Sequence, residues 1–239
     1  MTSWKSFGAS VRGPGHITTN LPNQDEWAAF HATWGDGIVV SDGIGSKPFS
    51  DFGSKAACCA VENAVAKFLK MTQKNHNFLF DCIKENWLLQ IKPLEPRDCS
   101  ATCLFGFRLG DGILHLGMLG DGLVAAVNLD GSVIVLEEDK SQGFSNITTA
   151  LSINTTAKNW RYLSLLEKDY TAIFLATDGV SDDLTNIEGF VTGFVKTFSR
   201  LASISANRHI REMLENWSTP KHSDDKSIAC LCCEEIIYE

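Results

Sequence analysis

The sequence predicts an α+β protein in which antiparallel sheets are flanked by paired helices. Apolar runs with strand character come in groups, and stretches with helical periodicity come in pairs instead of following each strand. That order disfavours a parallel, doubly wound sheet. The 239 residues, 44% of them hydrophobic, can bury one substantial core. No internal repeat, low-complexity tract or long linker divides them, so we expect a single domain over residues 1–239.

The first half of the chain predicts a hairpin followed by two helices. Residues 26–34 and 37–41 are apolar and rich in strand-forming side chains, and Gly35-Asp36 between them predicts a tight turn. Residues 53–72 and 77–91 carry apolar side chains at helical spacing. These two segments form the first expected helix pair.

The second half changes to the two-residue period of strands and then returns to helices. Asp130-Gly131 predicts another hairpin turn. The expected strands are 101–109, 112–119, 123–128, 133–136 and 170–176, the second helix pair is 187–201 and 204–217, and a last strand covers 227–238.

Charge and composition exclude several classes of protein. With 29 acidic against 21 basic residues, a net charge of -8 and no run of Lys or Arg, the chain is a poor candidate for binding nucleic acid. The N-terminus has no apolar signal core and no stretch reaches transmembrane length, so we expect no membrane association. The eight cysteines lie largely in helical or apolar stretches, where free thiols are the expected state. A reducing, cytoplasmic location follows.

Two acidic residues follow apolar runs at points where a glycine comes next. Asp42 follows the residues VVS and precedes Gly43, and Asp178 follows FLAT and precedes Gly179. Alone, each Asp-Gly pair is an ordinary turn or the start of a helix. Carboxylates gathered from separate strand ends repel one another, and a hard divalent cation relieves that repulsion.

Three further acids fit the same pattern. Asp25 precedes the first hairpin, Asp121 lies in a Gly-Asp-Gly turn, and Asp224 precedes the last strand. Each of them alone is most simply a solvated surface carboxylate. As a set, they predict a metal centre assembled from distant segments.

In chain order the sequence carries the motifs NQD, VVSDGIG, CSAT, LGDG, FLATDG and SDDKS, which together span residues 8–233 with their surroundings. These motifs resemble the PPM family, the metal-dependent type 2C protein serine/threonine phosphatases. The segment from Gly15-His16 to Asp25 is most similar to the compact bacterial branch. The resemblance implies a four-layer α/β/β/α sandwich, with two antiparallel sheets between two layers of paired helices.

The resemblance also implies a site for two Mg²⁺ or Mn²⁺ ions. Asp42 would bridge both ions, Asp25 would reach one through water, and Asp121 would help to hold a weaker third ion. The remaining ligands would be the Gly43 carbonyl, Asp178 and Asp224. The implied activity is hydrolysis of phosphoserine and phosphothreonine by a hydroxide that bridges the two ions, so that no protein nucleophile is needed.

The sequence departs from the family pattern at the positions that contact the phosphate and protonate the leaving group in many relatives. Many relatives have a histidine where this chain has Ile44, and an arginine where it has Asn20. The GDSR arginine is also missing after Asp121. We therefore predict that His16 or a metal-bound water supplies the leaving-group proton. Arg12, with Asn20 and His16, is the candidate for phosphate contact.

The stretch between Asp121 and Asp178 is short for this family, so we expect a reduced flap beside the cleft, with residues 146–151 as its remnant. Phosphorylated proteins are the implied substrates, a serine/threonine kinase is the implied counterpart, and we expect a monomer. A smaller flap would make substrate selection depend less on local sequence.

Two other functions compete with catalysis. A non-catalytic, phosphoprotein-binding or regulatory module would keep the fold, and the missing histidine and arginine favour it. Retention of Asp25, Asp42, Asp178 and Asp224 argues against it, because a scaffold has no need of convergent acids. A calcium-binding structural protein is disfavoured because no D-x-[DN]-x-[DN]-G loop is present.

Overall fold

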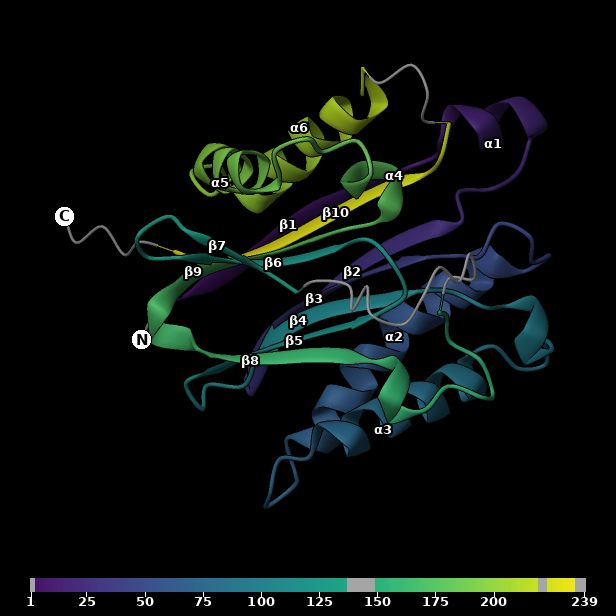
Figure 1. Ribbon diagram of the computed structural model, residues 1–239, viewed down its shortest axis with the longest axis horizontal. Helices are drawn as coiled ribbons and strands as arrows, with labels where there is room; N and C mark the ends of the chain where they lie inside the picture. The colour runs from purple at the N-terminus through teal and green to yellow at the C-terminus, as the bar shows by residue number, and fades with distance from the viewer. Residues whose placement is uncertain (1–2, 137–148, 219–222, 235–239) are drawn as a thin grey trace.

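Two five-stranded antiparallel sheets lie face to face in the computed structural model, which describes residues 3–136, 149–218 and 223–234. Helices cover the outer face of each sheet, which gives four layers (Figure 1). The predicted α+β class and the implied α/β/β/α sandwich are therefore confirmed.

Sheet A contains the first and last strands of the chain as neighbours. Its order is β1 (Trp4–Val11), β10 (Lys226–Cys233), β9 (Tyr170–Ala176), β6 (Leu123–Asn128) and β7 (Val133–Val135). Sheet B has the order β2 (Asp25–Ala32), β3 (Gly35–Asp42), β4 (Cys103–Arg108), β5 (Ile113–Leu119) and β8 (Arg161–Leu166).

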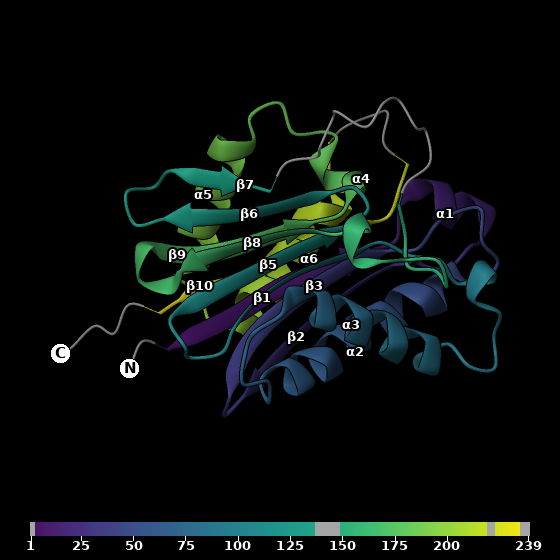
Figure 2. The ribbon, with the colours of Figure 1, turned by 60° about the horizontal axis from the view of Figure 1, so that its bottom comes forward.

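Helices α2 (Ser50–Phe68) and α3 (His76–Gln90) cover sheet B, and α5 (Ile187–Phe198) and α6 (Ser203–Glu215) cover sheet A (Figure 1). The short helices lie toward one end of the sandwich, where loops join the strands (Figure 2). They are α1 (Pro14–Thr19) and α4 (Asp178–Ser181). Single 3₁₀ turns occur at Pro96–Asp98, Ala157–Asn159 and Glu167–Asp169.

The central strands are apolar on both faces because each sheet is covered on both sides. On β4, Leu104 points into the layer between the sheets, whereas its neighbours Cys103 and Phe105 point toward α2 and α3. The same alternation on β9 places Ile173 between the sheets and Phe174 against α5. Truncating a fully buried leucine such as Leu104 to alanine is expected to cost about 2–5 kcal/mol.

The predicted turn at Gly35-Asp36 is wrong by two residues. Strands β2 and β3 pair Ala32 with Gly35, so Thr33 and Trp34 form the turn. Gly35 has another role: a Cβ there would lie 2.2 Å from the carbonyl oxygen of Arg108 on the neighbouring strand. The glycine therefore marks close approach of backbone rather than the hairpin loop.

Among the longer elements, the sequence pattern did not predict β1, α1 or β8. Most other boundaries agree within a few residues, and β6 and β9 match those expected. The last strand is described only to Cys233, and residues 235–238 of the expected strand lie outside the described residues, as do residues 146–148 of the expected flap remnant. Within the described ranges, no helix is both long and apolar enough to cross a membrane.

Candidate functional site

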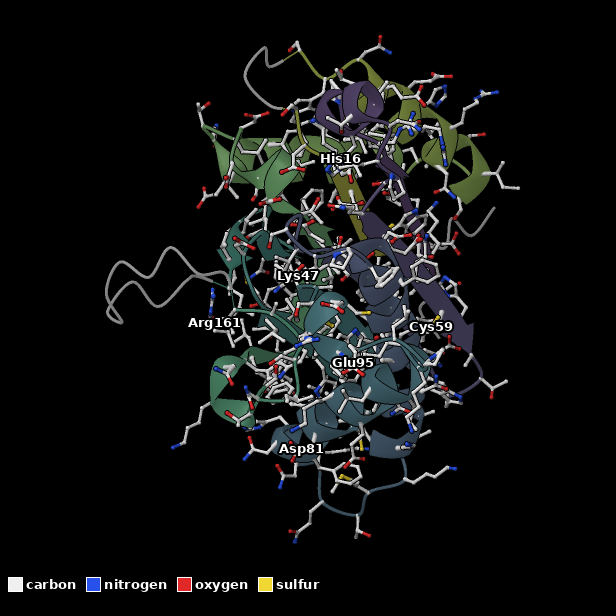
Figure 3. The ribbon with its side chains drawn as sticks, turned by 90° about the vertical axis from the view of Figure 1, so that its right-hand side faces the viewer. His16, Lys47, Cys59, Asp81, Glu95 and Arg161 are labelled. Carbon is white, nitrogen blue, oxygen red and sulfur yellow. The ribbon has the colours of Figure 1, made fainter. Side chains whose placement is uncertain are left out.

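The predicted acidic residues meet where strands of both sheets end. Asp25 begins β2 and lies directly across from Asp42, the last residue of β3. In sheet A, Asp178 follows the end of β9, and Asp224 precedes β10, which pairs with β9. Figure 3 looks onto the loop-bearing end of the molecule, where His16 and Lys47 are labelled.

The backbone of Asp42 is held by Thr102, the residue directly before strand β4. Its backbone N–H donates to Thr102 Oγ1 at 2.8 Å, and the Thr102 N–H donates to the Asp42 carbonyl at 2.8 Å. The Ser41 hydroxyl adds a third bond, to the Thr102 carbonyl at 2.6 Å. Because these contacts hold the backbone, the Asp42 side chain is delivered to the strand end in a defined direction.

Gly43 has the backbone freedom that a carbonyl ligand needs. Its N–H donates to the Gln24 carbonyl at 3.0 Å, while its own carbonyl accepts no hydrogen bond from the described residues. A Cβ at this position would lie 2.5 Å from the Ser50 carbonyl oxygen, which begins α2. Only glycine therefore fits between Asp42 and the start of that helix.

Thr177 connects the acids of the two sheets. Its hydroxyl donates to Asp25 Oδ2 at 2.7 Å and accepts the Ser227 N–H at 3.0 Å. Asp25, whose exposed fraction is 3%, thus has its carboxylate held by the segment between β9 and Asp178. Sequence reasoning missed Thr177 and Thr102, although both stand inside the motifs FLATDG and CSAT.

Burial and mutual repulsion raise the pKa values of three carboxyl groups. Burial raises the pKa of Asp25 to about 7, although the Thr177 hydroxyl partly offsets it. The pKa of Asp42 lies well above its ordinary value because of burial and then the charges of Asp25, Asp178 and Asp224. Burial, followed by the charges of Asp121 and Asp224, raises the pKa of Asp178 to about 6.

Asp121 and Asp224 belong to the same electrostatic cluster. Asp121 lies between Gly120 and Gly122, which have φ angles of 101° and 113°, in the left-handed region that favours glycine. Asp224 is exposed and its Oδ1 accepts the N–H of the next residue at 2.9 Å. All five acids expected from the sequence therefore interact, directly or through one another.

The chemistry of these donors fits a hard divalent cation, since they are carboxylates and one unpaired carbonyl. The raised pKa values of Asp25, Asp42 and Asp178 are caused first by burial and then by the charges of neighbouring carboxylates. Within the described ranges, no group of three or more His, Cys, Asp or Glu side chains is close enough together to hold a metal ion. The donor set therefore fits a divalent cation in its chemistry.

His16 lies on α1, where its Nδ1 is 2.8 Å from Asp225 Oδ2. Asp225 is a buried carboxylate that sequence reasoning did not single out. The signal is present in the SDDKS motif, where Asp225 directly follows Asp224. Ile44 lies in the loop after Gly43, and its apolar side chain cannot donate a proton.

The two other residues expected to contact the substrate phosphate, Arg12 and Asn20, have structural roles in the segment around α1. Arg12 is exposed and its Nη1 donates to the Leu21 carbonyl at 3.2 Å. It lines a cavity of about 720 Å³ between α1 and α6, together with Arg211. Asn20 adopts φ 57° as the C-cap of α1, a left-handed conformation that asparagine tolerates. That cap explains an asparagine there without a ligand.

The cysteines give no sign of nucleophilic chemistry. All eight lie in the described residues and outside any disulfide bond, and six of them are buried. Burial raises the pKa of Cys58, Cys103 and Cys230, which keeps each of them a neutral thiol. The expectation of free thiols is confirmed.

Solved structures share this two-sheet architecture. The chain is similar to a bacterial serine phosphatase, with 15% identity, a TM-score of 0.66 and 98% of each chain covered. It is also similar to RsbX in complex with magnesium, with 13% identity and a TM-score of 0.63 over 98% of this chain and 100% of the other. The catalytic domain of the serine/threonine protein phosphatase PstP, in complex with two manganese ions, gives 13% identity, a TM-score of 0.64 and the same coverage.

At these identities the likeness shows that the chain shares the fold of these proteins. A model of the family "Protein phosphatase 2C" matches residues 12–215. The chain therefore belongs to the protein phosphatase 2C family, as its motifs indicated. No curated protein matches it by sequence.

Proposed function

We propose that this protein hydrolyses phosphoserine and phosphothreonine in protein substrates and depends on a divalent cation. The observation that carries the proposal is the cluster of acids from both sheets. Burial and repulsion raise the pKa values of Asp25, Asp42 and Asp178, and Thr177 ties the two strand ends together. A cluster that is costly without a cation is well suited to bind one.

Asp42, Asp178, Asp224 and the Gly43 carbonyl would hold two Mg²⁺ or Mn²⁺ ions, with Asp25 acting through water and Asp121 serving a weaker third ion. Such ions would lower the pKa of water held between them and offset charge on the phosphoryl oxygens. The protein would position the substrate phosphate and supply the leaving-group proton. We assign the second role to His16, and phosphate contact to Arg12, His16 and Asn20.

The rest of the proposal concerns context. One domain over residues 1–239, with a reduced flap, would act as a cytoplasmic monomer on phosphorylated proteins. A serine/threonine kinase would be its counterpart. The acids that a divalent cation requires are all present, so the non-catalytic alternative is not favoured.

The test is release of phosphate from a phosphothreonine peptide while Mn²⁺ or Mg²⁺ is titrated into EDTA-treated protein. Turnover should need the metal and should fall at least 100-fold in Asp42→Asn. Asp81→Asn is the matched control, since Asp81 is an exposed aspartate on α3. Full turnover in EDTA, or an unaffected Asp42→Asn variant, would contradict the proposal.

A further inference from the structure

Helix α1, which carries His16, is held in place by polar contacts. It has six residues, none of them buried, and no side-chain N-cap. A helix this short is not stable by itself. Its partner is the segment before β10: the Gly15 N–H donates to the Ser223 carbonyl at 2.8 Å. The position of His16 therefore depends on that segment.

Asp225 is the centre of this attachment. Its side chain is 1% exposed, and its Oδ1 accepts the Gly13 N–H at 2.6 Å. Its Oδ2 accepts both the Gln24 N–H at 2.6 Å and His16 Nδ1 at 2.8 Å. A buried carboxylate is costly unless it accepts hydrogen bonds, and these three donors satisfy it.

These contacts connect His16 to the residues that adjoin two of the acids described above in the sequence. The oxygen that holds His16 also holds the peptide N–H of Gln24, the residue before Asp25. Asp225 itself follows Asp224. The approach is tight, because a Cβ at Gly13 would lie 2.2 Å from the Asp224 carbonyl oxygen. The close backbone approach at Gly13 thus fixes the start of α1, and the hydrogen bond to Asp225 fixes the His16 ring.

The hydrogen bond also determines which ring nitrogen carries a proton. A carboxylate accepts, so Nδ1 must be the donor. Nε2 makes no hydrogen bond to any described residue, and the side chain is 17% exposed. The geometry therefore leaves Nε2 as the nitrogen that can serve a substrate.

We propose that Asp225 is a positioning residue that holds His16 with Nδ1 protonated and presents Nε2 to the leaving oxygen of a phosphorylated serine or threonine. This inference rests on the proposed function. The bond from phosphorus to the side-chain oxygen breaks, and that oxygen takes the Nε2 proton of the imidazolium. Water supplies the new oxygen on phosphorus and loses a proton to solvent, and His16 regains its proton from solvent. Asp225 orients the ring through its hydrogen bond to Nδ1, and the pair replaces the function that Ile44 cannot supply.

The leaving group separates this role from a structural one. A serine or threonine alkoxide is a strong base and leaves with a proton, whereas p-nitrophenolate leaves without one. General acid catalysis contributes about 10²–10⁴-fold. Loss of the positioned acid should therefore slow a phosphothreonine peptide far more than p-nitrophenyl phosphate, whereas a misfolded site should slow both equally.

The experiment measures kcat for both substrates with Mn²⁺ in wild type, His16→Gln, Asp225→Asn and the double variant. We expect each single variant to lower the ratio of peptide kcat to p-nitrophenyl phosphate kcat by about 100-fold, and the double variant to lower it no further. His31→Gln is the control, because His31 also pairs with an aspartate, Asp36, at 2.7 Å but at the opposite end of β2. It should leave the ratio unchanged.

Equal losses on both substrates, or a double variant whose loss is the product of the single losses, would overturn the inference. Nitrogen NMR of ¹⁵N-histidine-labelled wild type covers the case in which Asp225→Asn does not fold. Neutral His16 should carry its proton on Nδ1, and a proton found on Nε2 alone would also overturn it. If wild type hydrolyses neither substrate with metal, it is the proposed function that fails, and the inference fails with it.

Discussion

Replacing Asp25 by asparagine is expected to stabilise the metal-free protein at alkaline pH, although it removes a proposed functional group. Folding raises the pKa of this carboxyl from 3.8 to about 7. Because the folded state binds this proton more tightly than the unfolded state does, the protein loses stability as pH rises from 3.8 to about 7. The loss is on the order of 4 kcal/mol at pH 8 but only ~1.5 kcal/mol at pH 5, at about 1.36 kcal/mol per pKa unit.

Asparagine does not ionise, and its side-chain oxygen can still accept the Thr177 hydroxyl. The advantage of Asp25→Asn over wild type should therefore grow by about 3 kcal/mol from pH 5 to pH 8. The growth should appear as roughly 6–12 °C in Tm for a domain of this size.

Urea unfolding in EDTA at both pH values measures this quantity. The test compares the difference in unfolding free energy between Asp25→Asn and wild type at the two pH values. Any pH-independent cost of the amide is the same at both and cancels. Asp81→Asn, on the exposed face of α3, should shift stability by less than about 0.5 kcal/mol at either pH. If the advantage of Asp25→Asn is the same at pH 5 and pH 8, the carboxylate does not bear the burial cost that we derive.

Three further predictions concern the metal, the sheet contacts and an internal histidine. Saturating Mn²⁺ at 100 times its Kd should stabilise wild type by about 2.7 kcal/mol in a thermal shift, and Asp42→Asn should abolish that shift. Thr177→Val removes two hydrogen bonds and should cost about 1–3 kcal/mol in urea unfolding. Burial lowers the pKa of His115 to about 4, so the contribution of His115 to stability should fall by up to ~3 kcal/mol as pH falls from 6.5 to 4, and wild type should lose stability relative to His115→Gln over that range in urea unfolding. A stability difference between wild type and His115→Gln that is the same at pH 6.5 and pH 4 would contradict the last prediction.

The sequence predicted the long, periodic elements because their burial pattern is local. Strand β9 is continuous and apolar since sheet A is covered on both faces. Strand β8 was missed because only one of its faces is well covered, and four of its six residues are half-buried while two are exposed. Strand β1 was missed because its pairing partner, β10, is more than two hundred residues away.

The site residues also divide into those that a local pattern predicts and those that depend on distant contacts. Asp42 and Asp178 could be predicted because each follows an apolar run and precedes a glycine, a pattern that a short window contains. The residues that hold them could not. Thr177 supports Asp25 across 152 residues, and Asp225 supports His16 across 209. Such contacts depend on which strands become neighbours, and a short sequence window carries no information about this.

The apolar layer between the sheets has a consequence for the distant acids. Asp42 belongs to sheet B and Asp178 follows a strand of sheet A, so the thickness of that layer helps to set their separation. Ala126 is fully buried in this layer, within the apolar packing cluster between the sheets. Replacing Ala126 by a larger residue would force the sheets apart. That would change the distance between Asp42 and Asp178, and so would weaken cation binding through a residue that is not itself a ligand.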